Sequence, residues 1–299
     1  MINLNKDAIY LTYSWGIKNQ GICGHTFEVI DYYFILKDFF NVKILLCEDI
    51  DEKMFKSAII NKYNFTENEV QNILNNTVFD NRPKILIGDY LLIVDGNLMK
   101  DRNVILKFKH IFMFACGKRD LHLIKDQNIT ILQDYRVYNS GPRTIDYKKK
   151  ILFKFKEYKN FEDNNLIYVS KNCREISQDE LKELPKDKKI IAIHNPNDVY
   201  EPFNNIEFIK APVENIWGKF STYYYTKVPR KFDCSPRFIA ECKYHKRNVV
   251  YMSNVLDYIE EDKGLFWRKY DIENNFKSIE LNNNDNIINI LKGQIWIIV

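Results

Sequence analysis

Glycine and proline are scarce in this sequence, and long apolar runs are absent from it. Ten Gly and eight Pro among 299 residues leave little room for a low-complexity linker or a repetitive tail. No apolar run approaches the roughly 20 residues that span a bilayer, and the N-terminus MINLNKDAIY lacks the apolar core of a signal peptide. We therefore expect a cytoplasmic protein without a membrane-spanning segment.

Cysteine patterns that hold metals or disulfides are also lacking. Six cysteines occur without a CxxC pair, and none lies in a cysteine and histidine cluster at the spacing of a zinc site. We interpret them as reduced thiols.

The overall charge is nearly balanced. Lys and Arg number 44 against 40 Asp and Glu, which gives a formal net charge of +4. This permits a polyanionic partner without requiring one. Abundant Ile, Lys, Asn, Tyr and Phe indicate a coding bias toward AT-rich codons, so surface lysines count for less than usual. A hydrophobic share of 45% with 28% charged residues predicts a soluble protein with a sizeable core.

Short apolar runs alternate along the chain with segments of helical periodicity, which predicts parallel sheets covered by helices. Expected strands cover residues 8–13, 42–47, 84–94, 110–114, 166–169, 190–194, 206–209, 220–225 and 249–252, and expected helices cover 25–40, 54–74, 178–184 and 236–244. The pattern changes after residue 128, near a Ser-Gly-Pro turn. We expect an α/β protein with two Rossmann-like domains, 1–150 and 151–285, and a segment 286–299 that packs back across them.

The segment DCSPRFIAE at 233–241 is the most informative one. Ser235 is a good helix N-cap and Pro236 suits the first turn, so a helix is expected to begin at the carboxyl edge of a sheet. Its amides attract a diphosphate, and Arg237 can add a cationic contact. Glu241 can accept hydrogen bonds from ribose hydroxyls, and Asp233 can face a sugar. A well-capped amphipathic helix explains the same residues.

An acidic residue at 233, seven intervening positions and Glu241 resemble the donor-site motif of GT-B glycosyltransferases, in which two Rossmann-like domains face each other across a cleft. The resemblance implies that Asp233, in place of the usual first Glu, contacts the transferred sugar. It also implies that Glu241 contacts the ribose and that the helix N-terminus, Ser235 to Arg237, holds the diphosphate. The spacing is more typical of retaining members. No Asp-x-Asp pair is placed to hold a divalent ion at the diphosphate, so we expect no metal and no cofactor besides a nucleotide-sugar substrate.

The N-terminal sequence GICGHT at 21–26 resembles the glycine loop of the same fold, which approaches the donor phosphates and the acceptor. It does not match GxGxxG, which disfavours a dinucleotide site. Gly24 allows a close backbone approach, and His25 is a candidate catalytic residue at the start of a helix. A simple turn with a helix cap is the structural alternative.

Other candidates follow predicted strands. Ser170, Lys171 and Arg174 come where GT-B enzymes often place a basic diphosphate ligand, although a solvated loop explains them as well. His194 and the segment 211–216, which contains Val213, can frame the nucleotide base through backbone groups. Asp95 can act as a general base if the enzyme inverts its sugar, but Asp-Gly is also a common turn.

Two basic segments raise the question of a nucleic-acid partner. They contain Lys148, Lys149 and Lys150, and Lys227, Arg230 and Lys231, the second group next to three tyrosines. A solvated lysine-rich face is the simpler interpretation. The compact, AT-biased chain is also similar to bacteriophage glycosyltransferases, some of which modify hydroxymethylated pyrimidines in DNA.

The leading prediction is thus a metal-independent glycosyltransferase that uses a nucleotide-sugar donor, with duplex DNA as a candidate acceptor. Two alternatives stay open. The acceptor is a surface glycan or a lipid-linked sugar, or the protein binds nucleotides or nucleic acid without catalysis.

Overall fold

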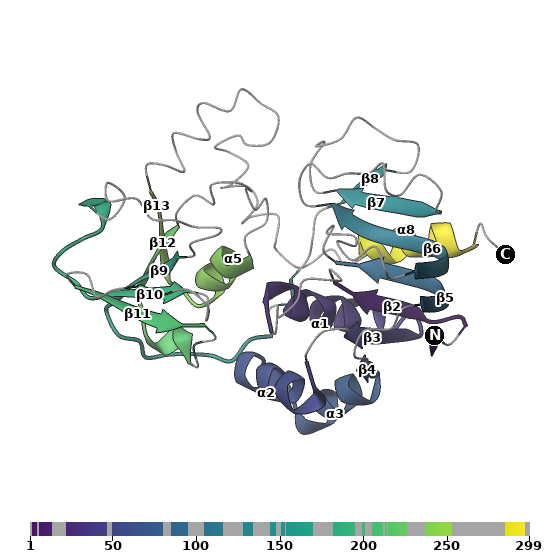
Figure 1. The fold of residues 1–299 in the computed structure, drawn as a ribbon, viewed down its shortest axis with the longest axis horizontal. Helices are drawn as coiled ribbons and strands as arrows, with labels where there is room; N and C mark the ends of the chain where they lie inside the picture. Colours follow the sequence, from purple (N-terminus) through teal and green to yellow (C-terminus); the bar gives the residue numbers. More distant parts are fainter. Residues whose placement is uncertain are drawn as a thin grey trace. The chain divides into compact units, whose positions relative to one another are not determined.

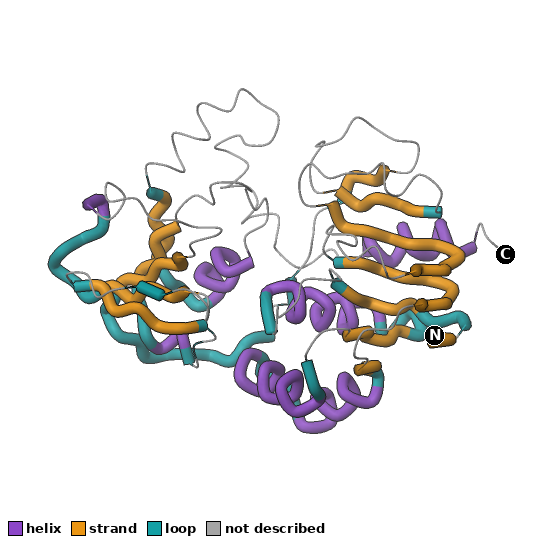
Figure 2. Tube along the Cα trace, in the orientation of Figure 1, coloured by secondary structure: helices purple, strands orange, loops and turns teal. Residues whose placement is uncertain are grey.

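The computed structural model describes residues 2–4, 6–13, 22–46, 50–79, 85–94, 105–115, 128–133, 144–147, 151–152, 154–169, 182–194, 199–200, 205–211, 213, 215–225, 237–252 and 285–296. The chain divides into two compact units. Unit 1 comprises Met1–Phe155 and Ser278–Val299, and unit 2 comprises Lys156–Lys277. Figure 1 shows the elements of both, and Figure 2 distinguishes helices from strands.

Unit 1 is built on an eight-stranded parallel sheet. Its strands are β1 (Ile2–Asn3), β2 (Ile9–Thr12), β3 (Val42–Leu46), β4 (Thr77–Phe79), β5 (Ile85–Ile93), β6 (Ile105–Ala115), β7 (Ile129–Gln133) and β8 (Thr144–Asp146). They lie in the order β4-β3-β2-β5-β6-β7-β8, and β1 pairs with β5. Every residue of β2 is buried, as expected for a central strand of a parallel sheet that is covered on both faces.

Helix α1 (Gly24–Leu36) packs on β2 and β3. Nine of its 13 residues are buried, so more than one face of the helix is covered. The buried Asp31 accepts a hydrogen bond of 2.9 Å from the hydroxyl of Tyr63, which also donates to the carbonyl of Phe27 at 3.2 Å. Tyr63 thereby satisfies a carboxylate that would be costly to bury alone.

Two helices follow β3, α2 (Glu52–Lys62) and α3 (Glu67–Asn75). They are separate helices because Thr66 and Glu69 form a capping box that starts α3. The Thr66 amide donates to the Glu69 carboxylate at 2.8 Å, and the Glu69 amide donates to the Thr66 hydroxyl at 3.3 Å. The single helix predicted over residues 54–74 is therefore wrong. The sequence TENE carried the signal for a second N-terminus.

The C-terminal helix α8 (Asp285–Trp296), yellow in Figure 1, belongs to unit 1. Ile287, Ile288 and Leu291 are buried, and the Lys292 ammonium lies 5.3 Å from the ring centroid of Phe39. The helix therefore returns the chain to its first unit.

Unit 2 holds a five-stranded parallel sheet in the order β11-β10-β9-β12-β13. Its strands are β9 (Asn165–Val169), β10 (Ile190–His194), β11 (Ile206–Lys210), β12 (Thr222–Tyr225) and β13 (Asn248–Tyr251). Helix α5 (Arg237–Tyr244) connects β12 to β13 and packs on β13. On this helix Phe238 stacks on Trp217 at 4.9 Å between centroids, and His245, just beyond its end, stacks on Trp217 at 4.2 Å.

The prediction of an α/β protein with two Rossmann-like halves is confirmed. If the count starts at β2 in unit 1 and at β9 in unit 2, the first five strands of both sheets lie in the order third, second, first, fourth and fifth. Every strand pair of the two sheets is parallel. The sequence patterns did not indicate β4, β7 or β8. Among the helices of the described part of the chain, none is long and apolar enough to span a membrane.

Candidate functional site

Each sheet reverses its direction of winding at one place. The reversal lies between β2 and β5 in unit 1 and between β9 and β12 in unit 2. In open parallel sheets, ligands bind outside the carboxyl ends of the strands at this point. The helices that follow β2 and β12, α1 and α5, therefore begin where a ligand is expected in each unit.

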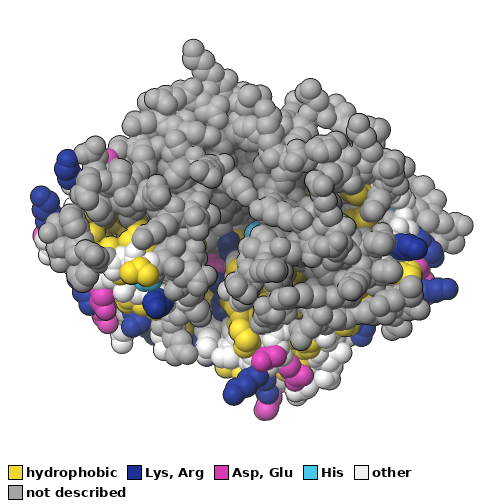
Figure 3. All heavy atoms as spheres, in the orientation of Figure 1, with side chains coloured by type: hydrophobic (Ala, Val, Ile, Leu, Met, Phe, Trp, Pro, Cys, Tyr) yellow, Lys and Arg dark blue, Asp and Glu magenta, His cyan; other side chains and the backbone are white. Residues whose placement is uncertain are grey.

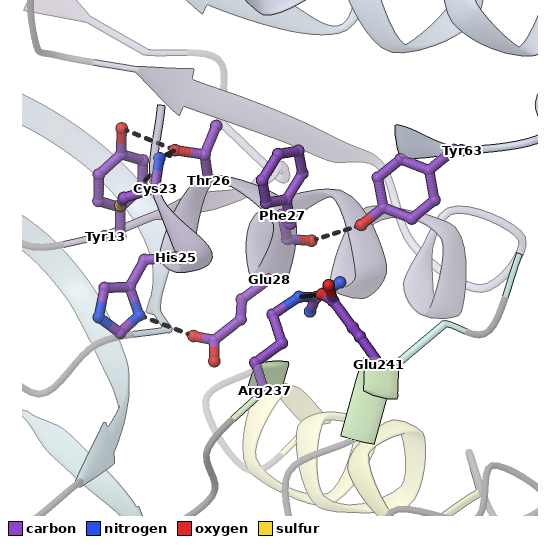
Figure 4. Close-up of polar contacts among 9 residues, drawn as sticks. All are labelled: Tyr13, Cys23, His25, Thr26, Phe27, Glu28, Tyr63, Arg237 and Glu241. Carbon is purple, nitrogen blue, oxygen red and sulfur yellow. Dashed lines mark hydrogen bonds and ion pairs between the residues drawn. The ribbon is translucent and has the colours of Figure 1, made fainter. Parts of the chain in front are cut away.

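The start of α1 is held by side chains close to the end of β2 (Figure 4). Cys23 is the N-cap, and its amide donates to the Thr26 hydroxyl at 3.0 Å. Thr26 in turn donates to the hydroxyl of Tyr13 at 3.3 Å, directly after β2. The first helical residue, Gly24, is exposed, and a Cβ built on it meets no atom of the described residues within 4 Å. Among the described residues, the space beside the Cβ position of Gly24 is therefore open, at the start of a 13-residue helix whose first amides can attract an anion.

His25 and Glu28 form a polar pair on the first turn of α1. The Nδ1 atom of His25 lies 2.9 Å from Oε2 of Glu28, and the His25 ring stacks on Tyr13 with 6.5 Å between centroids. The imidazole side chain is 33% exposed and the carboxylate 11%, so the carboxylate is the inner member. In the tautomer that donates Nδ1–H to Glu28, Nε2 is the basic nitrogen. A carboxylate that orients an imidazole in this way is the arrangement of a general base.

The two cysteines that the structure describes are free thiols. Burial raises the pKa of the Cys23 thiol, and it raises that of Cys242 on α5 well above its ordinary value. Both are therefore protonated near neutral pH, so neither has the thiolate that nucleophilic catalysis needs.

In unit 2, the first residue of α5 is paired with a residue one turn on (Figure 4). Nε of Arg237 lies 2.7 Å from Oε1 of Glu241, and both side chains are almost completely buried, at 8% and 2% exposure. The spacing of four residues places them on one helix face. The Nε atom of Arg237 is thus engaged with a carboxylate of its own helix.

His194 and Val213 are the other described candidates of unit 2. His194 ends β10 at the carboxyl edge of the sheet, but it is buried and packs edge-on against Tyr200 at 5.3 Å and Phe208 at 6.4 Å. Val213 is half-buried. Part of the backbone at the end of β10 is already hydrogen-bonded within the protein, because the His194 carbonyl accepts a hydrogen bond from the Ala211 amide.

Several predicted site residues lie outside the described part of the chain. They are Asp95, Lys148, Lys149, Lys150, Ser170, Lys171, Arg174, Lys227, Arg230, Lys231, Asp233, Ser235 and Pro236. Sequence reasoning missed Glu28 and Tyr13 as neighbours of His25. The spacing of three residues from His25 to Glu28 on a predicted helix was the available signal for the first.

Within the described ranges, no group of three or more His, Cys, Asp and Glu side chains is arranged to hold a metal ion. Charge on the described surface is mixed around α2, where dark blue and magenta side chains lie side by side along the lower edge of Figure 3. Exposed residues there include Glu52, Lys53 and Lys56.

No protein-family model and no curated protein sequence matches the chain. A search of solved structures finds similarity to MurG of Acinetobacter baumannii. The match covers 95% of this chain and 99% of that one, at 8% identity and a TM-score of 0.34. A likeness this distant decides neither the fold nor the activity.

Proposed function

We propose that the protein is a GT-B glycosyltransferase that takes a sugar from a nucleotide-sugar donor bound to unit 2. The observation that carries the proposal is the position of Glu241. Seven residues separate it from the acidic position 233, and it lies on the helix that follows the fourth strand of a doubly wound sheet, beside the point of reversed winding.

In the proposed reaction, the bond between the anomeric carbon and the diphosphate oxygen breaks, and an acceptor oxygen bonds to that carbon. The acceptor hydroxyl loses its proton, and the nucleoside diphosphate leaves with the bonding electron pair. The first amides of α5, with Lys171 and Arg174, stabilise the charge on the leaving group. Glu241 accepts hydrogen bonds from the ribose, and Asp233 faces the sugar.

Two stereochemical courses compete. The spacing from Asp233 to Glu241 favours retention. The His25 and Glu28 pair favours inversion, because a direct displacement needs a base for the acceptor proton and this pair has the geometry of one. Proton NMR of the first product formed distinguishes an α from a β linkage and decides between them.

The acceptor that we propose is duplex DNA with hydroxymethylated pyrimidines. The support for it is the two basic segments, 148–150 and 227–231, which suit a phosphate backbone. Labelled sugar should be incorporated into hydroxymethylated duplexes and not into unmodified ones. Incorporation only into glycan or lipid-linked acceptors would replace this part of the proposal and leave the donor chemistry in place.

The donor chemistry is tested first by thermal shift with a panel of nucleoside diphosphates and nucleotide sugars, because a ligand that binds the folded state raises the melting temperature. Glu241→Gln should lose most of the shift while keeping the melting temperature of the ligand-free protein close to wild type. Glu207→Gln is the matched control, because Glu207 lies on β11, has a side chain that is 48% exposed, and forms an ion pair with Lys189. If no nucleotide shifts the wild-type protein, the proposal fails.

A further inference from the structure

The first crossing of the chain from unit 1 to unit 2 lies within residues 151–164, all of which the structure describes except residue 153. The division between the units falls between Phe155 and Lys156. The residues on each side of this division contact their own unit. Those contacts limit where the crossing can bend.

Residues 154 and 155 are fixed to unit 1. Phe155 and Tyr63 form an antiparallel β-bridge, and the Asn64 amide donates to the Lys154 carbonyl at 2.8 Å. The Lys154 ammonium also forms an ion pair with the Glu69 carboxylate on α3. Backbone and side-chain contacts therefore hold the same two residues of the crossing.

The side chain of Phe155 connects the crossing to helix α1. Phe155 is 2% exposed, and its ring stacks on that of Tyr63 with 5.4 Å between centroids. The Tyr63 ring also stacks on Phe65 at 4.7 Å. The Tyr63 hydroxyl donates to the Phe27 carbonyl of α1 (Figure 4) and to the carboxylate of Asp31. The residues before the division, α1 and the corner between α2 and α3 therefore form one packed body.

Tyr158 is the first residue after the division with side-chain contacts to unit 2. Its ring meets the ring of His245 edge-on with 5.8 Å between centroids. Its hydroxyl donates to the side-chain oxygen of Asn215 at 3.4 Å. Both partners belong to unit 2, so Tyr158 is fixed to the second unit.

The residues that follow continue the contact with unit 2. The buried guanidinium of Arg247 lies over the Phe161 ring, with 3.8 Å from its central carbon to the ring centroid. The Glu162 amide donates to the Gly218 carbonyl at 3.0 Å. The crossing is therefore attached to unit 2 at several points before β9 begins.

Lys156 and Glu157 are the residues between the two sets of contacts. Glu157 is exposed and Lys156 is half-buried, and neither forms a hydrogen bond or an ion pair with another residue of the described part of the chain. We infer that Lys156 and Glu157 form the hinge of this crossing, about which the two units turn while each keeps its own packing. Changes of φ and ψ in a few residues are enough for such a motion. The contacts that support this hinge are independent of the proposed sugar transfer.

Distances between spin labels, measured by pulsed electron paramagnetic resonance on the full chain, test the motion. Labels attached to p-acetylphenylalanine leave the six native cysteines untouched. Exposed positions for them are Lys56 and Lys107 in unit 1, and Lys210 and Asn248 in unit 2. The distance distribution between Lys56 and Lys210 should be broader than the distributions within each unit. Equal widths would overturn the hinge.

Paired glycine substitutions locate the motion in the chain. Glycine widens the accessible range of φ and ψ, so Lys156→Gly combined with Glu157→Gly should broaden the distribution between the units and leave those within each unit unchanged. Lys159→Gly combined with Asn160→Gly is the matched control, because these two residues are also exposed but lie between residues that contact unit 2. The control pair should leave all distributions unchanged. No broadening from the first pair, or equal broadening from both pairs, would overturn the inference.

Discussion

Gly24 provides a test that separates a ligand site from a structural turn. A Cβ built on Gly24 meets no atom within 4 Å in the part of the chain that the structure describes, and the residue is the first of helix α1. Alanine adopts a helical backbone without strain, and it lowers the conformational entropy of the unfolded chain. Gly24→Ala should therefore leave stability unchanged or raise it by about 0.4–1 kcal/mol.

Sugar transfer by the Gly24→Ala variant should change in the opposite direction from its stability. If phosphate or acceptor atoms approach the first amides of α1, the added methyl group occupies their space. A loss of contact worth about 1.4 kcal/mol lowers turnover tenfold. Gly24→Ala should thus keep or gain stability while losing at least this much sugar transfer.

Two other glycines supply control variants for Gly24→Ala. Gly293 in α8 also has no atom within 4 Å of a built Cβ, so Gly293→Ala should stabilise the protein by about 0.8–1 kcal/mol and leave transfer intact. A Cβ on Gly88 would lie 2.7 Å from Cε1 of Phe108, so Gly88→Ala should cost about 1–3 kcal/mol.

Urea unfolding and labelled-sugar transfer are measured on the three variants side by side. Two results for Gly24→Ala would refute the reasoning. A loss of stability like that expected for Gly88→Ala would mean that the space is filled, and full turnover with full stability would mean that no ligand enters it.

Three further predictions concern other residues and the metal requirement. His25→Gln and Glu28→Gln should each lower transfer by a factor on the order of 10² to 10⁴ without weakening donor binding, and unchanged steady-state turnover would assign the pair to the surface of α1. Tyr63→Phe removes the 2.9 Å hydrogen bond to the buried Asp31 and should cost about 1–3 kcal/mol in urea unfolding; an unchanged midpoint would show that another group satisfies Asp31. Sugar transfer should persist in excess EDTA, and a loss that magnesium or manganese restores would establish a metal-dependent enzyme.

The strands and helices that the sequence predicted are those with a strong local pattern. β2, β3 and β10 are mostly apolar, because a parallel strand is buried on both faces, and α1 follows a glycine-containing sequence. β4 and β8 have only three residues each, too few for any periodicity to appear. β4 pairs with β3 and β8 pairs with β7, and a pattern within three residues does not indicate either partner.

The candidate site was less accessible to sequence reasoning. Helical spacing brings Arg237 to Glu241, but it does not say whether the guanidinium turns to its own helix or to a ligand. The Nε contact with Glu241 is a matter of side-chain conformation, which depends on tertiary packing. The same holds for His194, which ends a strand at the expected edge but packs among aromatic rings.

Hydrogen exchange with and without a nucleoside diphosphate tests the central claim most directly, since it asks whether the donor binds at α5. The amides of 237–244 should exchange more slowly in the presence of the nucleotide that raises the melting temperature, and this protection should disappear in Glu241→Gln. Protection confined to other segments, with unchanged exchange in α5, would contradict the assignment of the donor site.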